Sequence, residues 1–346
     1  MPDDVREALS FAVAFAVVLA TTPVAIRIAR ATSFYDHPVG YKGHQRATPY
    51  LGGVAVATGF ALAAILLAHP MPHLAPILLC AAALLAVGTV DDRYRLGVLP
   101  RLAVEIAAGA LLFAAGIGWS PFGGDLANLA LTVIFVLGVI NAFNLMDNID
   151  GAAATVGGVT GLGLGVLALL QGRPYVAALG FALAGACAGF LPFNLFARPA
   201  RIFLGDGGSM VLGFVLAALI MAVGRVGSQG VGVLLLAVVL VGLPALDTTL
   251  VVVSRLRRGA NVFSGGRDHL THRLLLKLGD ARRVALVVGA LQGALLALAI
   301  LLYEVGGAAR LLGAAAMIAL GIAVVAALET PRWARGLSTS PNWFVK

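Results

Sequence analysis

Apolar segments long enough to cross a lipid bilayer dominate this sequence and limit what it can fold into. A membrane-spanning helix needs about 20 predominantly apolar residues. Hydrophobic residues make up 60% of the chain and charged residues 12%, with a mean hydropathy of +0.97, so polar residues are too few to cover a water-soluble protein of 346 residues. We therefore predict an all-α, polytopic integral membrane protein with about eleven transmembrane helices. The predicted segments are 8–29, 51–69, 74–90, 99–118, 126–143, 151–170, 175–193, 209–224, 231–253, 284–303 and 308–328.

The positions of lysine and arginine predict the orientation of these segments, because short cytoplasmic loops hold an excess of both. When successive loops are assigned to alternate sides, 20 of the 24 basic residues fall on one side of the membrane. This distribution predicts an N-terminus outside the cell and a C-terminus in the cytoplasm. We expect one membrane domain over residues 1–346. Its predicted cytoplasmic loops are 31–50, 91–100, 141–151, 194–208 and 255–283.

The formal net charge of +8 comes from the excess of lysine and arginine in the predicted cytoplasmic loops. Basic loops on the cytoplasmic side of a bilayer lie beside anionic lipid head groups and anionic cytosolic molecules. The sequence therefore predicts the membrane and small anionic substrates as partners, and it does not predict nucleic acid.

Three of the predicted cytoplasmic loops bring carboxylates to the same membrane surface. "TVDDRYR" contains Asp91 and Asp92, "NAFNLMDNIDG" contains Asp147 and Asp150, and "FLGDGGS" contains Asp206. The first pair also fits a solvated loop paired with its own arginines. The glycine-rich loop fits either a simple turn or a helix start whose backbone N–H groups bind phosphate.

The stretch "NAFNLMDNIDG" is the hardest to explain as a structural element alone. If the helix before it continues, Asn144, Asp147 and Asp150 lie on adjoining parts of one face, while Asn141 turns away. Oxygen ligands suit Mg²⁺, which takes one or two carboxylates together with waters and substrate phosphates. We therefore predict a magnesium site here, with Asp206 as the second carboxylate.

A third polar group lies in "DHLTHRLLLKLG", within the last long cytoplasmic loop. One interpretation is an amphipathic surface helix with its leucines buried. The other is that His269, His272 and Arg273 share a polar face, with Thr271 pointing elsewhere. Imidazole and guanidinium groups donate hydrogen bonds to the charge that grows on a leaving phosphate. Zinc is not predicted, since neither a cysteine nor a third histidine is close.

Six motifs together resemble the polyprenyl-phosphate N-acetylhexosamine-1-phosphate transferases of the MraY, WecA and TagO type. They are "KGHQRATPYLGG", "DDRYR", "NAFNLMDNIDG", "GDGGSMVLGF", "LPALDTT" and "DHLTHRLL", in this order. The resemblance is nearest to the branch that uses UDP-GlcNAc. It implies Mg-dependent transfer of a sugar-1-phosphate, GlcNAc-1-phosphate in that branch, from a UDP-sugar to a polyprenyl phosphate, with UMP as the second product and Mn²⁺ as the alternative metal.

The resemblance also implies roles for individual residues. Asp147 and Asp206 align with metal-binding positions. The implied catalytic residues are Asp91, Asp92, Asp147, Asp150 and His272. The residues implied to bind substrate are Lys42, His44, Asn144, His269 and Arg273.

The sequence departs from the family's usual pattern at three positions. Arg95 replaces a frequent third aspartate, Thr271 replaces a frequent second histidine, and Asn148 replaces a frequent glycine. None of these replaces an implied metal ligand. Any role that the family gives to the positions of Arg95 and Thr271 does not carry over to this chain.

Chemistry restricts the mechanism. The second pKa of a phosphate monoester is near 6, so a lipid phosphate is mostly dianionic at neutral pH and needs no strong base. Asp91 or Asp92 could orient it or accept a residual proton, and both alternatives stay open. Direct displacement is favoured over a covalent aspartate intermediate.

The resemblance implies an enzyme of the inner (plasma) membrane, with the active site on the cytoplasmic face. It also implies that this enzyme initiates the synthesis of a cell-envelope polysaccharide, such as lipopolysaccharide or teichoic acid. The choice between monomer and homodimer stays open.

Two other classes of membrane protein share part of this pattern. A transporter also places ionisable groups in membrane helices, but near mid-bilayer and in related repeats, whereas these acids lie at one surface. A CDP-alcohol phosphotransferase is closer, because "DNIDGAAA" imitates the start of its motif. Thr155 stands where that motif has arginine, and no acid lies between Asp150 and Asp206.

Overall fold

The computed structural model describes residues 2–36, 47–71, 73–224, 231–262, 265–330 and 333. Over these residues the protein is almost entirely helical, as predicted, with thirteen α-helices and one pair of two-residue antiparallel strands. The elements are α1 (Asp3–Ala31), β1 (Tyr35–Asp36), β2 (Thr48–Pro49), α2 (Gly52–Leu67), α3 (Leu74–Tyr94), α4 (Val98–Ala114), α5 (Asp125–Met146), α6 (Ala152–Leu170), α7 (Pro174–Asn194), α8 (Gly205–Gly224), α9 (Val231–Leu240), α10 (Gly242–Arg257), α11 (Leu270–Leu278), α12 (Ala281–Val305) and α13 (Gly307–Leu328).

Eight of the described helices are long and apolar enough to cross a membrane: α1, α3, α5, α6, α7, α8, α12 and α13. Ten of the eleven predicted segments each coincide with one helix, and the count of eleven spans is not confirmed. Helix α2 has 16 residues and α4 has 17. The segment predicted as 231–253 is divided into α9 and α10, which are bent by 79°.

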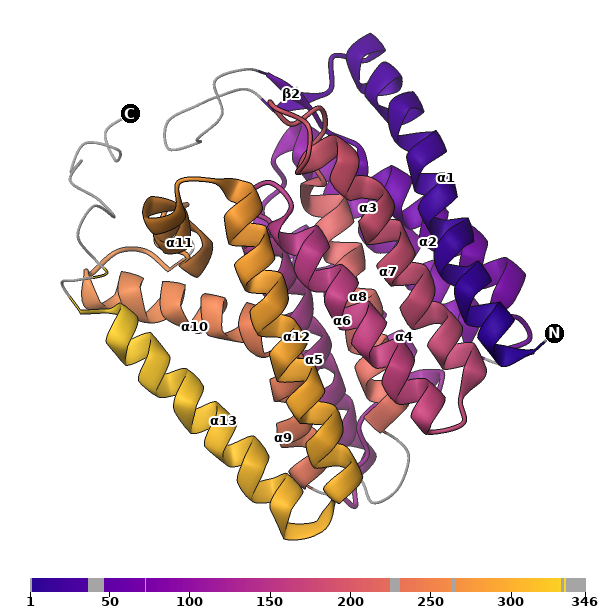
Figure 1. Cartoon of the computed structure of the whole chain (residues 1–346), viewed down its shortest axis with the longest axis vertical. Coiled ribbons are helices and arrows are strands. Elements are labelled where there is room, and N and C mark those ends of the chain that lie inside the picture. The colour runs from indigo at the N-terminus through magenta and orange to yellow at the C-terminus, as the bar shows by residue number, and fades with distance from the viewer. Residues whose placement is uncertain are drawn as a thin grey trace.

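Helix α8 is the central helix of the bundle. It contacts α2, α3, α5, α6 and α7, and Figure 1 shows it surrounded by the other helices. Nearly all of its residues are buried, from Gly205 to Val223. A helix that is apolar on every side is typical of such an interior position. The polar start of α8, which carries Asp206, is therefore held at the centre of one end of the bundle.

Glycines allow α3 and α8 to approach closely near this end. A side chain at Gly88 of α3 would lie 2.4 Å from the backbone nitrogen of Gly207. Gly205 has a φ of +77°, and a side chain there would lie 2.5 Å from Asp92 Oδ2. A residue without a side chain accommodates both the left-handed backbone and this close approach. The end of α3 is thereby brought against the first turn of α8.

The break between α9 and α10 is stabilised by Gln292 of α12. Its side chain donates to the carbonyl of Leu240 at 2.8 Å and accepts from the backbone N–H of Leu243 at 3.4 Å. Gln292 is fully buried, and backbone groups freed by a break within a membrane need such partners. As a result, α10 runs across the bundle beneath α11 (Figure 1).

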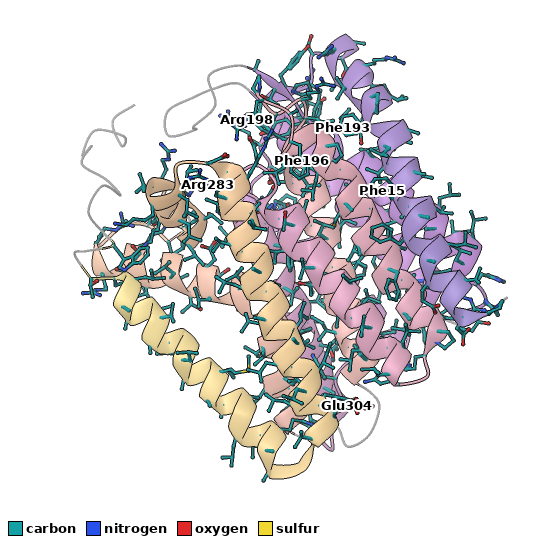
Figure 2. The ribbon with its side chains drawn as sticks, in the orientation of Figure 1. Phe15, Phe193, Phe196, Arg198, Arg283 and Glu304 are labelled. Carbon is teal, nitrogen blue, oxygen red and sulfur yellow. The ribbon has the colours of Figure 1, made fainter. Side chains whose placement is uncertain are left out.

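The two ends of the bundle differ in the loops that they carry. Figure 2 shows Arg198 and Arg283 near one end and Glu304 near the opposite end. The first two belong to loops predicted to be cytoplasmic, and Glu304 to a loop predicted to be external. Residues predicted to lie on opposite sides of the membrane are thus at opposite ends of the helical bundle.

Candidate active site

The carboxylates singled out in the sequence come from helices that begin or end at one end of the bundle. Asp91 and Asp92 lie in the last turn of α3, Asp147 directly follows α5, and Asp206 lies in the first turn of α8. Alternating helix directions account for this arrangement, since α3 and α5 end where α8 begins. Asp150 lies four residues beyond the end of α5, in the loop that leads to α6.

Asn144 connects α5 directly to the start of α8. Its Nδ2 donates to Asp206 Oδ1 at 2.9 Å and lies 3.0 Å from Ser209 Oγ. Helix α5 ends at Met146, so the predicted continuation of the helix through Asp147 and Asp150 is wrong, but Asn141 turns away from this group as predicted. It donates to Glu105 of α4 at 2.7 Å, and Glu105 is buried between helices. The amide of Asn144 therefore fixes one oxygen of Asp206.

Asp92 binds the N-terminal end of α8. Both of its carboxylate oxygens lie 3.1 Å from the backbone nitrogen of Asp206, which donates to them. The first N–H groups of a helix have no partner within it and carry partial positive charge, so a carboxylate is stabilised there. Asp92 thereby holds the loop that presents Asp206.

Arg101 is the central cation of the site, although it belongs to none of the motifs recognised in the sequence. Its Nη1 donates to Asp91 Oδ2 at 2.9 Å and to Asp206 Oδ2 at 3.0 Å, and its Nη2 donates to Asn144 Oδ1 at 3.1 Å. The planar guanidinium is suited to several oxygen acceptors at once. One sequence signal was present: Arg101 stands four residues before buried Glu105, on the same face of α4.

Asn194, at the end of α7, is a second residue that sequence reasoning missed. Its Oδ1 accepts from the backbone N–H of Gly151 at 2.6 Å, and its Nδ2 donates to the carbonyl of Ile202 at 2.9 Å. The same amide thus links the loop after α5 to the segment before α8. A buried polar residue at the end of an apolar helix was the available signal.

The carboxylates of the α5–α6 loop have raised pKa values. Burial, followed by the charges of Asp206 and Asp150, raises the pKa of Asp147 to about 8, although a hydrogen bond from the Gly205 backbone opposes this rise. Burial raises the pKa of Asp150 to about 6. Carboxylates packed together favour protonation over ionisation, and a bound divalent cation reverses that preference.

These residues fit Mg²⁺. Asp147 and Asp206 supply the hard oxygen donors that this ion prefers, and Mg²⁺ usually completes its shell with waters and substrate phosphates. Within the described part of the chain, no cluster of three or more His, Cys, Asp or Glu side chains is arranged to hold a metal.

The predicted amphipathic helix of the last long loop is α11. Asp247, fully buried on α10, accepts from the backbone N–H of Leu270 at 2.6 Å and hydrogen-bonds with His269 Nδ1 at 2.8 Å. A carboxylate from another helix thus caps the start of α11 and fixes the ring of His269.

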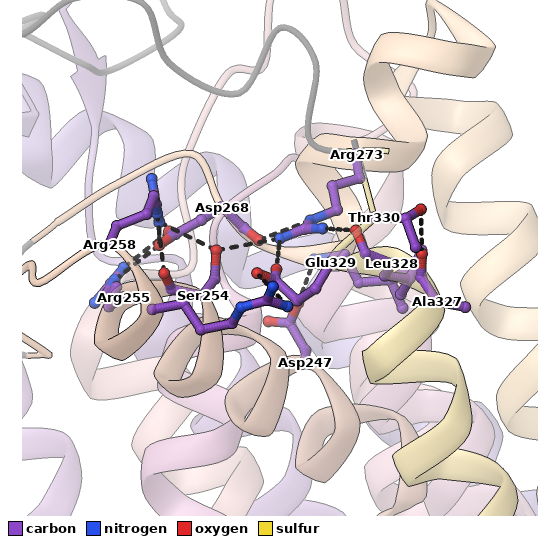
Figure 3. Close-up of polar contacts among 12 residues, drawn as sticks. Asp247, Ser254, Arg255, Arg258, Asp268, Arg273, Ala327, Leu328, Glu329 and Thr330 are labelled. Carbon is purple, nitrogen blue, oxygen red and sulfur yellow. Dashed lines mark hydrogen bonds and ion pairs between the residues drawn. The ribbon is translucent and has the colours of Figure 1, made fainter. Parts of the chain in front are cut away.

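Arg273 has a different environment from the one predicted. Its guanidinium points toward the end of α13 (Figure 3), where it donates to the carbonyl of Leu328 and, at 2.6 Å, to Glu329. Only 1% of Arg273 is exposed. The expectation that Arg273 shares a polar face with His269 and His272 is wrong, because acceptors distant in sequence bind its charge. Substrate binding by Arg273 stays a prediction.

Thr271 of α11 contacts the loop of residues 147–151, here called the carboxylate loop, and His272 is the next residue of α11. Burial, followed by the charges of His269 and Arg267, lowers the pKa of His272 to about 3, so its imidazole is neutral near pH 7. The hydroxyl of Thr271 donates to Oδ1 of Asn148.

Lys42 and His44, predicted to bind substrate, lie outside the described residues.

Comparison with known proteins places the site in a family context. The model of glycosyl transferase family 4 matches residues 74–224, a range that holds the carboxylates of all three loops. A decaprenyl-phosphate N-acetylglucosaminephosphotransferase of Mycolicibacterium smegmatis is 32% identical, over 83% of this chain and 80% of that protein. Its counterpart in Mycobacterium tuberculosis is 33% identical, over 71% of this chain and 70% of the relative. An undecaprenyl-phosphate alpha-N-acetylglucosaminyl 1-phosphate transferase of Escherichia coli is 28% identical, over 78% and 77%.

Proposed function

The chain belongs to glycosyl transferase family 4, and from this premise we propose that it transfers GlcNAc-1-phosphate from UDP-GlcNAc to a polyprenyl phosphate. The observation that carries the proposal is a cluster at one end of a membrane bundle, in which Arg101 binds Asp91 and Asp206 while Asp92 and Asp147 lie beside Asp206. The relatives named above carry names that describe this reaction. The products are polyprenyl diphosphate-GlcNAc and UMP.

In the proposed step, an oxygen of the lipid phosphate attacks the phosphorus that bears the sugar, and the bond from that phosphorus to UMP breaks. The attacking and leaving groups are both anionic, so catalysis depends on neutralising charge and on alignment. Arg101 contributes positive charge, while Asn144 and Asp92 hold Asp206 in place. Asp91 and Asp92 stay alternatives for orienting the lipid phosphate or accepting a residual proton.

Asp147 and Asp206 would hold Mg²⁺, with Mn²⁺ as an alternative, and Asp150 would shape the charge around it. When bound, the ion polarises a phosphoryl oxygen and offsets charge in the transition state. His269 and His272 are proposed to lie toward the nucleotide-sugar. A neutral His272 can still donate one hydrogen bond to the leaving phosphate.

The protein is a multi-pass membrane enzyme, and we propose the inner (plasma) membrane as its location. The excess of basic residues predicts that the site faces the cytoplasm, with the N-terminus outside. This proposal includes about eleven crossings by a single domain and initiation of cell-envelope polysaccharide synthesis. Reporters fused after Arg258 and after Gln171 test it, because the first should report the cytoplasm and the second the exterior. The reverse result would contradict the orientation.

The decisive assay uses purified protein with Mg²⁺, a polyprenyl phosphate and a panel of UDP-sugars. We expect UMP release with UDP-GlcNAc only when the lipid phosphate is present. Release without the lipid would indicate hydrolysis, and no release with any UDP-sugar would contradict the proposed function. A matched preparation of Asp206→Asn serves as the negative control. Chelation of the metal should abolish release by the wild-type enzyme.

A further inference from the structure

A single side-chain hydrogen bond joins the carboxylate loop to α11. Asn148 Oδ1 accepts the hydroxyl of Thr271, while Asn148 Nδ2 donates to the carbonyl of Leu145 at 2.6 Å. Thr271 is fully buried and Asn148 is half-buried. Over the described residues, no other side-chain hydrogen bond connects residues 147–151 with α11. The amide of Asn148 therefore links the end of α5 to the first turn of α11.

The two linked segments have separate anchors elsewhere in the fold. Asn194 holds the backbone of Gly151, and Asp247 caps α11 at Leu270. Asp247 belongs to α10, which packs against both α5 and α11, so α10 relates the two segments indirectly. Asn148 directly follows Asp147, and Thr271 directly precedes His272. The hydrogen bond between Asn148 and Thr271 therefore adds a direct link between the residues next to the proposed metal-binding carboxylate and the histidine.

Both partners stand where the sequence departs from the family's usual motifs. A glycine at position 148 would have no side chain to accept the hydroxyl of Thr271, and a histidine at position 271 would have no hydroxyl to donate, so this hydroxyl–amide hydrogen bond requires both departures together. The two groups are neutral, and a buried neutral hydrogen bond contributes geometry more than charge. This combination points to a positioning role in this chain and not to a metal-binding or acid–base role.

We propose that Asn148 and Thr271 form a positioning pair that fixes His272 of α11 against the loop of Asp147 and Asp150. The inference rests on the proposed transferase function and deepens it. A hydrogen bond to a leaving phosphate strengthens in the transition state, so loss of alignment lowers kcat more than it changes KM. The pair acts through its neighbours and does not contact the reacting atoms.

The test compares Thr271→Val, which keeps the shape but removes the hydroxyl, with Thr271→Ser, which keeps the hydroxyl. UMP release is measured per amount of folded enzyme, with thermal unfolding recorded for each variant. We expect Thr271→Val to lower kcat at least fivefold, with KM for UDP-GlcNAc within twofold of wild type. Thr271→Ser should stay within twofold in both constants. In an Asn148→Ala background, Thr271→Val should cause no further loss, since the acceptor is already gone.

The outcomes separate the pair from the function on which it rests. If wild type is active and Thr271→Val keeps its kcat, the positioning role is overturned and the transferase function stands. Equal losses in Thr271→Ser and Thr271→Val also overturn the role, because the hydroxyl would not matter. If the wild-type enzyme releases no UMP with any UDP-sugar, the proposed function fails and the positioning role fails with it.

Discussion

The guanidinium of Arg101 lies 3.0 Å from a carboxylate oxygen of Asp206, although 105 positions separate the two residues in the sequence. The same nitrogen binds Asp91, and the neighbouring nitrogen binds Asn144. One cation thus connects α3, α4, α5 and α8 at the centre of the candidate site. An arginine in the first turn of a helix is unfavourable for the helix dipole, and its three acceptors outside α4 offset that cost.

Replacing Arg101 with lysine should therefore impair the enzyme despite keeping the charge. The ammonium of lysine is compact and does not reproduce the planar fork that reaches three acceptors. We expect Arg101→Lys to lower kcat/KM for UDP-GlcNAc at least tenfold, and Arg101→Gln to lower it at least a hundredfold. Arg95→Lys, at an exposed position nearby, is the matched control and should stay near wild type. An active Arg101→Gln would remove Arg101 from the proposed mechanism.

The assignment of the metal to Asp147 and Asp206 predicts a loss of both activity and ion binding. Asparagine keeps the size of either side chain but removes the charge that holds a divalent cation. We expect Asp147→Asn and Asp206→Asn each to lower UMP release by at least a thousandfold at saturating Mg²⁺. Binding of Mn²⁺, followed by its electron paramagnetic resonance signal, should weaken in both variants.

Asp125→Asn is the control for this pair of variants, because Asp125 is exposed at the start of α5, the end opposite Asp147. It should leave both readouts unchanged. Normal Mn²⁺ binding by Asp206→Asn would assign the metal to other residues.

The carboxylates of this site could be predicted from the sequence, because polar motifs at the ends of apolar segments must lie at a membrane surface. Alternation of the helices then brings Asp92, Asp147 and Asp206 to one end. Arg101 and Asn194 are polar residues at the ends of apolar helices as well, but neither lies in a cluster of polar residues, and their partners belong to other helices. Spacing along one helix says which residues share a face, but not which face another helix covers.

The broken helix was missed for a related reason. The segment 231–253 is apolar throughout most of its length, and hydropathy alone predicts one continuous span. The break coincides with Gly242 and Pro244, and Pro244 lacks the N–H that would bind the carbonyl of Leu240. Gln292 of α12 supplies a donor to that carbonyl and an acceptor for the N–H of Leu243. A count of apolar residues does not register this local signal, and the partner 52 residues away from Leu240 is not visible in the segment itself.

His272 gives a prediction about stability and pH. Its pKa is about 3 in the folded protein, lowered by burial and by the charges of His269 and Arg267, against an ordinary value near 6.5. As pH falls below 6.5, the unfolded chain takes up a proton that the folded protein does not, so stability decreases toward pH 3. We expect the unfolding midpoint to fall between pH 7 and pH 5, and to fall less in His272→Gln.

The matched control for that comparison is His69→Gln, since His69 is exposed. Its pH dependence should equal that of wild type. Thermal unfolding in one detergent at constant ionic strength provides the measurement. Parallel curves for wild type and His272→Gln would show that His272 titrates at its ordinary pKa in the folded protein.

Arg273 separates the two interpretations of α11 most directly. The sequence pattern predicts a residue that binds substrate, whereas its contacts with Glu329 and the carbonyl of Leu328 indicate that it fastens α11 to α13. Removing one partner of a buried ion pair costs about 3–5 kcal/mol. We therefore expect Arg273→Met, which keeps the apolar stem, to lower the unfolding midpoint clearly. Its kcat and KM per folded molecule should stay within twofold of wild type.

Arg283→Met is the control for this variant, because Arg283 is exposed at the same end of the protein. It should change neither stability nor kinetics. The opposite result for Arg273→Met would be an unchanged unfolding midpoint with KM for UDP-GlcNAc raised tenfold or more. That outcome would mean that the guanidinium leaves α13 to bind the nucleotide-sugar during turnover, and substrate binding by Arg273 would then hold despite its buried position.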